Sequence, residues 1–178
     1  VHSLGKSPVL TTDDGLVLAE SGALVETVVE RFGNGRLAPP AGSPEALRYR
    51  YWLHYAEGSA MPPLLLKMVF DKIETSKMPF FAKPIAQAIA GKAKSSFITP
   101  NITTHLDFME GELGKSEWFA GDAFSGADIQ MSFPVEAAAA RGGLDGSRPK
   151  LMAWLARIHA RPAYQKALER GGPYGLLT

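Results

Sequence analysis

The stretch Phe124-Ser125-Gly126-Ala127-Asp128-Ile129 decides how this chain folds. Ser125 followed three residues later by Asp128 is a capping box, with Asp in the position usually held by Glu or Gln. The Ser125 hydroxyl is placed to accept a hydrogen bond from the amide of Asp128, and the Asp128 carboxylate to accept one from the amide of Ser125. Phe124 and Ile129 take the two positions of a hydrophobic staple. The stretch therefore predicts the start of a helix.

The residues that follow this cap are almost wholly apolar. Between Asp128 and Arg141 only Glu136 carries a charge. A helix that is apolar on nearly all sides is normally buried, so we expect other helices to surround this one. Pro134 leaves the carbonyl of Gln130 without its helical partner, because proline has no amide hydrogen. Ser and Asp also begin many ordinary helices, so an unremarkable helix start remains the alternative interpretation.

Length and composition limit the possible classes. With 178 residues, 46% of them hydrophobic, the chain can form one large or two small domains with a buried core. The absence of cysteine excludes disulfides, thiolate metal sites and cysteine nucleophiles within the chain. The net charge is +1 with acids and bases mixed, and the uncharged run 95–106 is too short and polar to span a bilayer. We therefore expect neither nucleic acid nor membrane as a partner, although the absence of cysteine does not by itself place the protein in the cytosol.

The first segment has the pattern of a β-hairpin. Pro8 opens a β-rich run over residues 8–12, Asp13-Asp14-Gly15 is a turn signal, and residues 16–19 form the second run. A hairpin alone is marginal in water, so further strands are expected from an upstream segment or a partner chain. The first residue is Val1 rather than Met, and we expect the polypeptide to begin earlier.

Helical periodicity dominates the rest of the chain. Ser21 is a suitable N-cap for a helix that runs to Phe32, before Gly33-Asn34-Gly35. The Pro-rich segment that follows is the best domain boundary. Two long helical regions are predicted next: residues 44–73, with an interruption at Pro62-Pro63, and residues 84–113, with a bend at Pro100. The helix that starts at Ser125 follows them, and two further helices are predicted around Trp154 and over residues 162–170.

The order and spacing of these pieces resemble the cytosolic glutathione transferases over almost the whole chain. The stretch 51–55 is most similar to bacterial and fungal members. The resemblance implies an α+β protein of two domains, in which residues 1–35 are the C-terminal half of a thioredoxin-like domain, 36–43 a linker and 44–178 an all-helical domain. It also implies that the thiol-activating Tyr, Ser or Cys lies upstream of Val1. The residues that carry the resemblance are 5–10, 19–21, 119–122, 124–128, 154–158 and 161–162.

The same resemblance assigns five residues to glutathione. It implies a cis peptide before Pro8, with the backbone of Ser7 presented to the cysteinyl part of the ligand. Glu20 is expected to take the γ-glutamyl ammonium, and Ser21 with the first helix amides its carboxylate. Lys6 is placed to meet the glycine carboxylate. The alternatives are a proline that begins an edge strand, a Ser that only caps, and two solvated surface charges.

Candidates for the electrophile pocket follow from position in the family. These are Tyr55, Met61 and Leu65, although aromatic residues and Met at helical spacing are more often part of a core. His54 and Ser59 match positions that reach the glutathione of a neighbouring subunit in some bacterial members. A helix-surface His is an equally good interpretation. The remaining histidines show no metal-ligand spacing, so we expect no metal site.

The resemblance implies a cytoplasmic glutathione transferase acting in detoxification. It would conjugate the thiol of glutathione to a small hydrophobic electrophile, and would reduce peroxides with glutathione as a further activity. Glutathione is then a cosubstrate, no cofactor is needed, and the protein is expected to be a homodimer. Two alternatives stay open: a non-catalytic protein of this fold that binds glutathione or a protein partner, and a dehydroascorbate or thiol-transfer activity that would need an upstream Cys.

Overall fold

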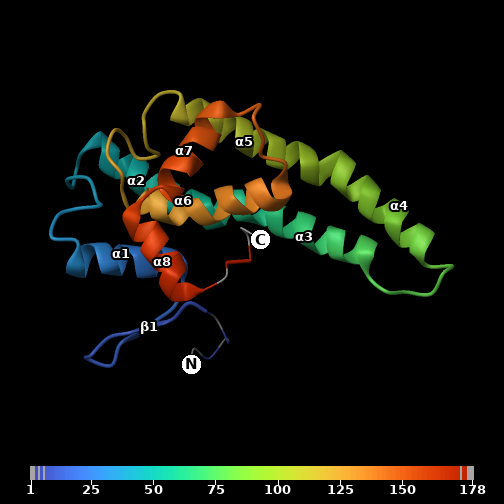
Figure 1. Ribbon diagram of the computed structural model, residues 1–178, viewed down its shortest axis with the longest axis horizontal. Coiled ribbons are helices and arrows are strands. Elements are labelled where there is room, and N and C mark those ends of the chain that lie inside the picture. The colour runs from blue at the N-terminus through green and yellow to red at the C-terminus, as the bar shows by residue number, and fades with distance from the viewer. Residues whose placement is uncertain (1–2, 4, 6, 173, 176–178) are drawn as a thin grey trace. The chain divides into compact units, whose positions relative to one another are not determined.

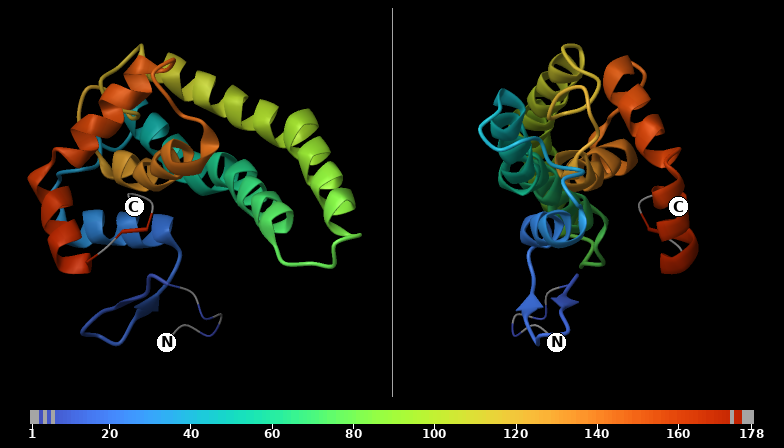
Figure 2. Two further views of the ribbon diagram at one scale, coloured as in Figure 1. Left: turned by 45° about the vertical axis from the view of Figure 1, so that its right-hand side comes forward. Right: turned by 90° about the vertical axis from the view of Figure 1, so that its left-hand side faces the viewer.

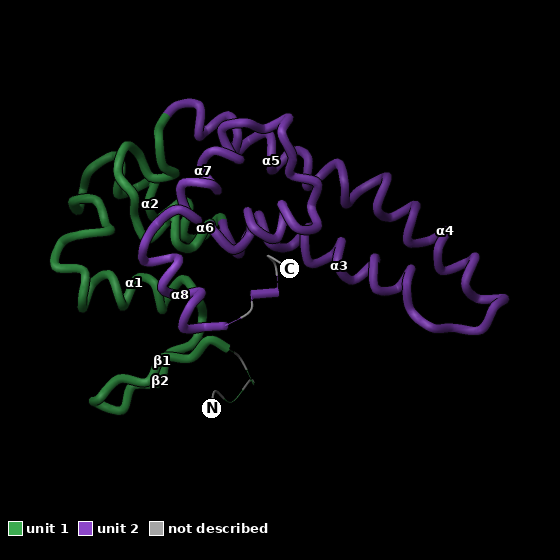
Figure 3. The backbone as a smooth tube through the Cα atoms, in the orientation of Figure 1, with its two compact units in different colours: residues 1–55, 116–131 green, residues 56–115, 132–178 purple. Residues whose placement is uncertain are grey.

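A computed structural model describes residues 3, 5, 7–172 and 174–175. It contains a two-stranded sheet followed by a series of helices (Figure 1), which is the predicted α+β class. By packing, the chain forms two compact units (Figure 3): residues 1–55 with 116–131, and residues 56–115 with 132–178. The division 1–35, 36–43 and 44–178 rests on the sequence and stays a prediction.

The first unit begins with the predicted hairpin (Figure 2). Strand β1 (Leu10–Thr11) pairs antiparallel with β2 (Val17–Leu18), with Leu10 opposite Leu18. The amide of Gly15 donates to the carbonyl of Thr12 at 2.9 Å, and Gly15 has a φ of +83°, which glycine adopts without strain. The strands are only two residues long, which is shorter than the runs predicted from composition.

Helix α1 (Ser21–Phe32) has its predicted bounds but a different cap. Ser21 is already the first helical residue, and Glu20 is the N-cap, because the carbonyl of Glu20 accepts from the amide of Leu24 at 2.9 Å. The assignment of Ser21 as N-cap is therefore wrong. The helix ends at Gly33, where a Cβ atom would lie 2.2 Å from the carbonyl oxygen of Val29, so only glycine fits.

Helix α2 (Pro44–Tyr55) follows the Pro-rich segment. The hydroxyl of Ser43 accepts from the amide of Ala46 at 3.1 Å and so caps the helix, with Pro at the first helical position. Trp52 is 1% exposed and packs on Phe119, with ring centroids 4.5 Å apart. The guanidinium of Arg48 donates to the carbonyl of Phe119 at 3.0 Å. Helix α2 thus holds the loop 116–125 that leads into α6 (Gly126–Ala137).

In the second unit, α3 (Met61–Thr75) and α4 (Lys83–Ala93) lie side by side, and α5 (Thr99–Leu113) continues from α4 (Figure 2). The carboxylate of Glu110 on α5 accepts from the amides of Lys150 and Leu151 at 3.0 and 2.8 Å. It thereby caps α7 (Pro149–His159), which α8 (Pro162–Gly171) follows. The apolar core residues of α5 and α7 are Ile102, Leu106, Met109, Leu113, Leu151, Trp154, Leu155 and Ile158.

Three short π-helical segments stand near the prolines of the helical part. Segment η1 (Ala56–Ala60) precedes Pro62-Pro63, η2 (Lys94–Ile98) precedes Pro100, and η3 (Ala138–Gly142) follows Pro134. Proline removes one amide from the helical ladder, and a wider turn next to it lets the chain continue as a helix. The predicted interruptions at the first two sites are confirmed, and their form is a change of helix type.

Helix α6 is less enclosed than its composition predicts. Met131, Pro134 and Val135 are fully buried, but Ile129 and Phe133 are 40% and 44% exposed. These two residues are four apart and so lie on one side of the helix. The expectation that other helices surround it completely is wrong, because apolar residues remain common on protein surfaces.

Candidate functional site

The capping box holds the loop and the helix together through one buried carboxylate. Asp128 is 0% exposed. Its Oδ2 accepts from the amide and the hydroxyl of Ser125 at 3.0 and 3.1 Å, and its Oδ1 accepts from the amide of Phe119 at 3.0 Å. The Ser125 hydroxyl thus donates to this carboxylate, whereas the sequence predicted it as an acceptor. The bond from Phe119 has no counterpart in the capping-box pattern.

Gly126 allows the start of α6 to approach its neighbours closely. Its amide donates to the carbonyl of Leu37 at 2.8 Å. A Cβ at this position would lie 2.8 Å from the hydroxyl of Tyr49 and 3.0 Å from a methyl of Val25. The first turn of α6 is therefore fitted against α1, α2 and the segment between them, within the first unit.

Four of the five predicted glutathione residues lie in the described part of the first unit. The peptide between Ser7 and Pro8 is cis, and both residues are exposed. Glu20 is exposed and has φ 73° and ψ 112°, a region that non-glycine residues rarely adopt. Ser21 is half-buried at the first position of α1. Lys6 lies outside the described residues.

Gln130 is a neighbour of this group that the sequence analysis did not single out. It is 5% exposed, and its Nε2 donates to the hydroxyl of Ser21 at 2.8 Å. This bond ties the first turn of α1 to the helix behind the capping box. A polar amide between Ile129 and Met131 in an otherwise apolar helix was the available signal, since a buried amide needs a partner.

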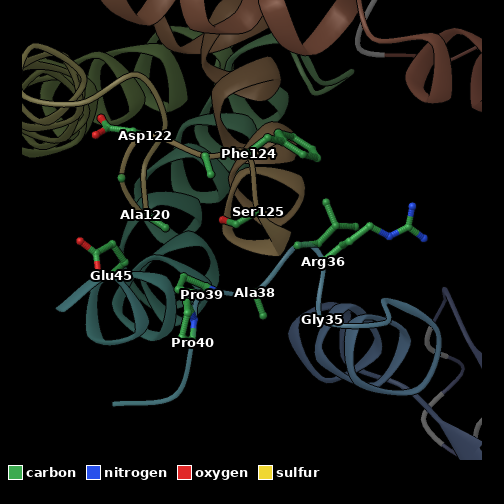
Figure 4. Close-up of a pocket in the computed structure, with 13 residues that line it drawn as sticks. Gly35, Arg36, Ala38, Pro39, Pro40, Glu45, Ala120, Asp122, Phe124 and Ser125 are labelled. Carbon is green, nitrogen blue, oxygen red and sulfur yellow. The ribbon is translucent and has the colours of Figure 1, made fainter. Parts of the chain in front are cut away.

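Two cavities of the first unit are lined by other residues than the predicted ones. A cavity of about 540 Å³ lies between residues 35–40, Glu45 and residues 120–125 (Figure 4). A second one, of about 290 Å³, is lined mainly by apolar residues of α1 together with Ile129. Neither is lined by Ser7, Pro8, Glu20 or Ser21.

Tyr55, predicted for the electrophile pocket, lies in the aromatic core of the first unit. It is 6% exposed, and its ring centroid lies 4.9 Å from that of Trp52 and 5.7 Å from that of Tyr51. Burial, and to a smaller extent Tyr51, raise the pKa of Tyr55 above its usual range. His54, its neighbour on α2, is exposed.

The remaining pocket candidates, Met61 and Leu65, lie in the second unit, as does Ser59, which was predicted with His54 to reach a neighbouring subunit. Met61 and Ser59 are half-buried, and Leu65 is 52% exposed on α3. A cavity of about 10 Å³ beside them is lined by Ala60, Pro63 and residues of α5. That space is about the size of one water molecule, so it does not hold a substrate.

The described residues contain neither a metal-binding cluster nor a membrane-spanning helix. Within residues 3, 5, 7–172 and 174–175, no group of three or more His, Asp or Glu side chains is placed to hold a metal ion. None of the described helices combines the length and the apolar character needed to cross a membrane.

Comparison with known proteins gives one consistent result. The profile of the family "Glutathione S-transferase, C-terminal domain" matches residues 97–162. Glutathione S-transferase 1 of Saccharomyces cerevisiae is 31% identical over 98% of this chain and 78% of its own length. Glutathione S-transferase 3 of Schizosaccharomyces pombe is 30% identical over 94% of this chain and 68% of its own length.

Solved bacterial structures are similar as well. A glutathione S-transferase from Actinobacillus pleuropneumoniae superposes with a TM-score of 0.77 at 27% identity, covering 99% of this chain and 74% of that one. A sphingomonad glutathione S-transferase complexed with glutathione gives a TM-score of 0.72 at 27% identity, with 96% and 76% covered. The predicted likeness to bacterial and fungal members is confirmed.

Proposed function

Because this chain belongs to the glutathione S-transferase family, we propose that it binds glutathione and transfers its sulfur to small electrophiles. The observation that carries the proposal is the start of α1. There an exposed carboxylate, a hydroxyl and the N-terminal amides of a helix stand on consecutive residues, Glu20 and Ser21. We prefer this place to the cavity of about 540 Å³, because it offers partners for both charges of one ligand end.

The γ-glutamyl end of glutathione carries an ammonium and a carboxylate. In our proposal the Glu20 carboxylate accepts hydrogen bonds from the ammonium. The ligand carboxylate accepts from the Ser21 hydroxyl and the first amides of α1, since a helix N-terminus attracts anions. Gln130 supports this arrangement, because its bond of 2.8 Å fixes where the Ser21 hydroxyl stands.

The backbone of Glu20 supports a ligand role further. With φ 73° and ψ 112°, this residue occupies a region that costs about 1–3 kcal/mol for a side chain other than glycine. Such strained residues cluster at ligand sites.

We propose that Ser7 contributes backbone groups to the same ligand. An N–H and a C=O next to β1 can pair with the cysteinyl part of glutathione as a short added strand. The sulfur would then react as a thiolate, which is a stronger nucleophile than the thiol. It attacks an electrophilic carbon, so that an S–C bond forms while the bond from that carbon to its leaving group breaks and the leaving group keeps the electron pair. With a peroxide it attacks one oxygen and the O–O bond breaks, so that an alkoxide leaves and takes a proton from water. A second glutathione then converts the resulting sulfenic acid to glutathione disulfide and water. Glutathione is the cosubstrate, and we assign no residue of this chain to the activation of its thiol.

Two measurements on the same preparation test this proposal. Calorimetric titration reports glutathione binding, and turnover of a chlorodinitrobenzene substrate reports conjugation. We expect saturable binding and turnover that depends on glutathione. Binding without turnover of this substrate, of an epoxide or of an organic peroxide would contradict the enzyme and favour the non-catalytic alternative. Absence of binding would contradict the site itself.

A further inference from the structure

The loop between α3 and α4 carries two exposed aromatic side chains. In the second unit it lies at the free end of this helix pair, away from α5 and α7 (Figure 1). Phe80 is 88% exposed and Phe81 is 67% exposed. Their rings touch edge to face, with centroids 5.7 Å apart and planes at 84°. The loop therefore presents a pair of rings to its surroundings, and we call residues 76–85 the aromatic tip.

An apolar stripe continues from the tip along α4. Ile85 and Ile89 follow Phe81 at intervals of four residues, and they are 63% and 60% exposed. Side chains at this spacing lie on one side of a helix. Contiguous exposed apolar surface of this kind marks a place where a protein meets a partner or a membrane.

The charge around the tip has one sign. From residue 75 to residue 106 the sequence contains no Asp or Glu, whereas Lys77 and Lys83 stand on either side of the two phenylalanines, both exposed. The preceding acids, Asp71 and Glu74, are held in ion pairs by Lys94 at 2.9 and 2.5 Å. The lysines of the tip are thus not neutralised by neighbours along the chain.

We propose that the aromatic tip docks on the surface of an anionic lipid bilayer. Phe80 and Phe81 would enter the headgroup boundary, while Lys77 and Lys83 extend their ammonium groups to lipid phosphates. The strength of such peripheral binding grows with the buried apolar area and with the electrostatic attraction to anionic lipids, and the tip offers both through its two rings and two lysines. Docking of the tip on the tip of a second copy is less favourable, because it would bring the same lysines face to face.

This inference departs from the expectation that no membrane is a partner. That expectation considered only segments that span a bilayer, and a tip that lies on its surface needs no such segment. The inference is also independent of the proposed glutathione site, since its residues lie in the loop after α3 and in α4, within the second unit.

Vesicle flotation of the purified chain tests the docking. We expect binding to phosphatidylcholine vesicles that contain phosphatidylserine, loss of this binding at high salt, and little binding to phosphatidylcholine alone. Replacing both phenylalanines (F80S with F81S) should weaken partitioning at least tenfold. Replacing both lysines (K77Q with K83Q) should weaken it by roughly 25-fold, since each basic residue near an anionic surface contributes about fivefold.

Matched control variants distinguish docking by the tip from nonspecific binding to vesicles. Phe97 is 59% exposed in η2, outside the tip, so F97S removes an exposed ring elsewhere on the second unit. Lys150 and Lys166 are exposed lysines of α7 and α8, so K150Q with K166Q removes the same charge as the tip variant. We expect both controls to bind vesicles as the wild type does.

A fluorescent reporter measures insertion directly. The native tryptophans, Trp52, Trp118 and Trp154, are 1%, 8% and 0% exposed, so their emission should not respond to vesicles. In F80W the new emission should shift to the blue with anionic vesicles and be quenched by brominated lipid. Failure of the wild type to bind these vesicles, unchanged emission of F80W, or tight binding by the double phenylalanine variant would each overturn the proposal. The proposal would also be overturned if the double phenylalanine variant changed its oligomeric mass while the wild type did not bind vesicles, because the tip would then be a protein interface.

Discussion

Asp128 shows how much of this fold depends on one side chain. Its carboxylate is 0% exposed and accepts hydrogen bonds from two amides and a hydroxyl, including the amide of Phe119 nine residues earlier. A buried amide that loses its acceptor costs about 1–3 kcal/mol. Besides capping the helix, the carboxylate therefore connects the loop 116–125 to α6 through hydrogen bonds.

Replacing Asp128 by Ala should lower the free energy of unfolding by about 2–4 kcal/mol, because two buried amides lose their partner. Denaturant titration of both forms measures the change, and glutathione affinity should stay nearly the same. The control is Asp122→Ala, an exposed acid in the same loop, which should change stability by less than about 0.5 kcal/mol. Equal midpoints and slopes for wild type and Asp128→Ala would contradict the role given to this carboxylate.

Glu20 should show opposite effects on stability and binding. Glycine adopts φ 73° without strain, so Glu20→Gly should relieve part of about 1–3 kcal/mol and raise the midpoint of unfolding slightly. The same change removes the proposed partner of the γ-glutamyl ammonium and should weaken glutathione binding. Thermal unfolding with calorimetric titration measures both. A Glu20→Gly variant less stable than Glu20→Ala would argue against backbone strain at this position.

At the level of elements, the sequence predicted the helices well and their detailed geometry less well. Capping residues and prolines act locally, so the hairpin, the bounds of α1 and the interruption before Pro62-Pro63 could be read directly. The N-cap of α1 could not be predicted in this way, because the φ of Glu20 follows from packing and not from residue type. Gln130 was missed because its partner, Ser21, is 109 residues away in the chain. The π-helical form of the interruptions also depends on neighbouring helices.

A second buried carboxylate joins three helical elements of the second unit. Glu136 on α6 is 3% exposed and accepts from the hydroxyls of Tyr164 on α8 and Tyr174 after it, at 2.6 and 2.7 Å. His159 on α7 lies 3.0 Å from the same carboxylate. Burial, and then the bond to Glu136, raise the pKa of both tyrosines above the usual range.

The raised pKa values of these two tyrosines predict that the free energy of unfolding falls at alkaline pH. A hydroxyl whose pKa is raised in the folded state gives its full stabilisation below the unfolded pKa of about 10, and loses it as the pH rises through the folded value. The double variant Tyr164→Phe with Tyr174→Phe should be less stable at neutral pH by about 1–3 kcal/mol. Its stability should also vary less above pH 10. Tyr51→Phe, at an exposed position, is the control, and parallel alkaline profiles would contradict the assignment.

At the level of the whole molecule, we propose a homodimer. On α3, in the second unit, Leu65, Met68 and Val69 are 52%, 42% and 42% exposed, and their spacing of three and four residues places them on one side of the helix. On α2, in the first unit, Leu47 and Tyr51 are four residues apart and 68% and 49% exposed. An exposed apolar helix face of this kind is typical of a protein interface. Light scattering at micromolar concentration should give twice the mass of the polypeptide, and a monomer mass over the whole concentration range would contradict the assembly.

The central claim, that the start of α1 holds the γ-glutamyl end of glutathione, is tested most directly by calorimetric titration of glutathione into wild type and Glu20→Ala. A charge-assisted hydrogen bond is worth about 1.5–3 kcal/mol, so the variant should bind roughly tenfold to hundredfold more weakly. Glu30→Ala, an exposed acid at the other end of α1, should bind as the wild type does. A glutathione analogue without the γ-glutamyl amine should bind the wild type poorly and not distinguish it from Glu20→Ala. Equal affinity of wild type and Glu20→Ala for glutathione would contradict the claim.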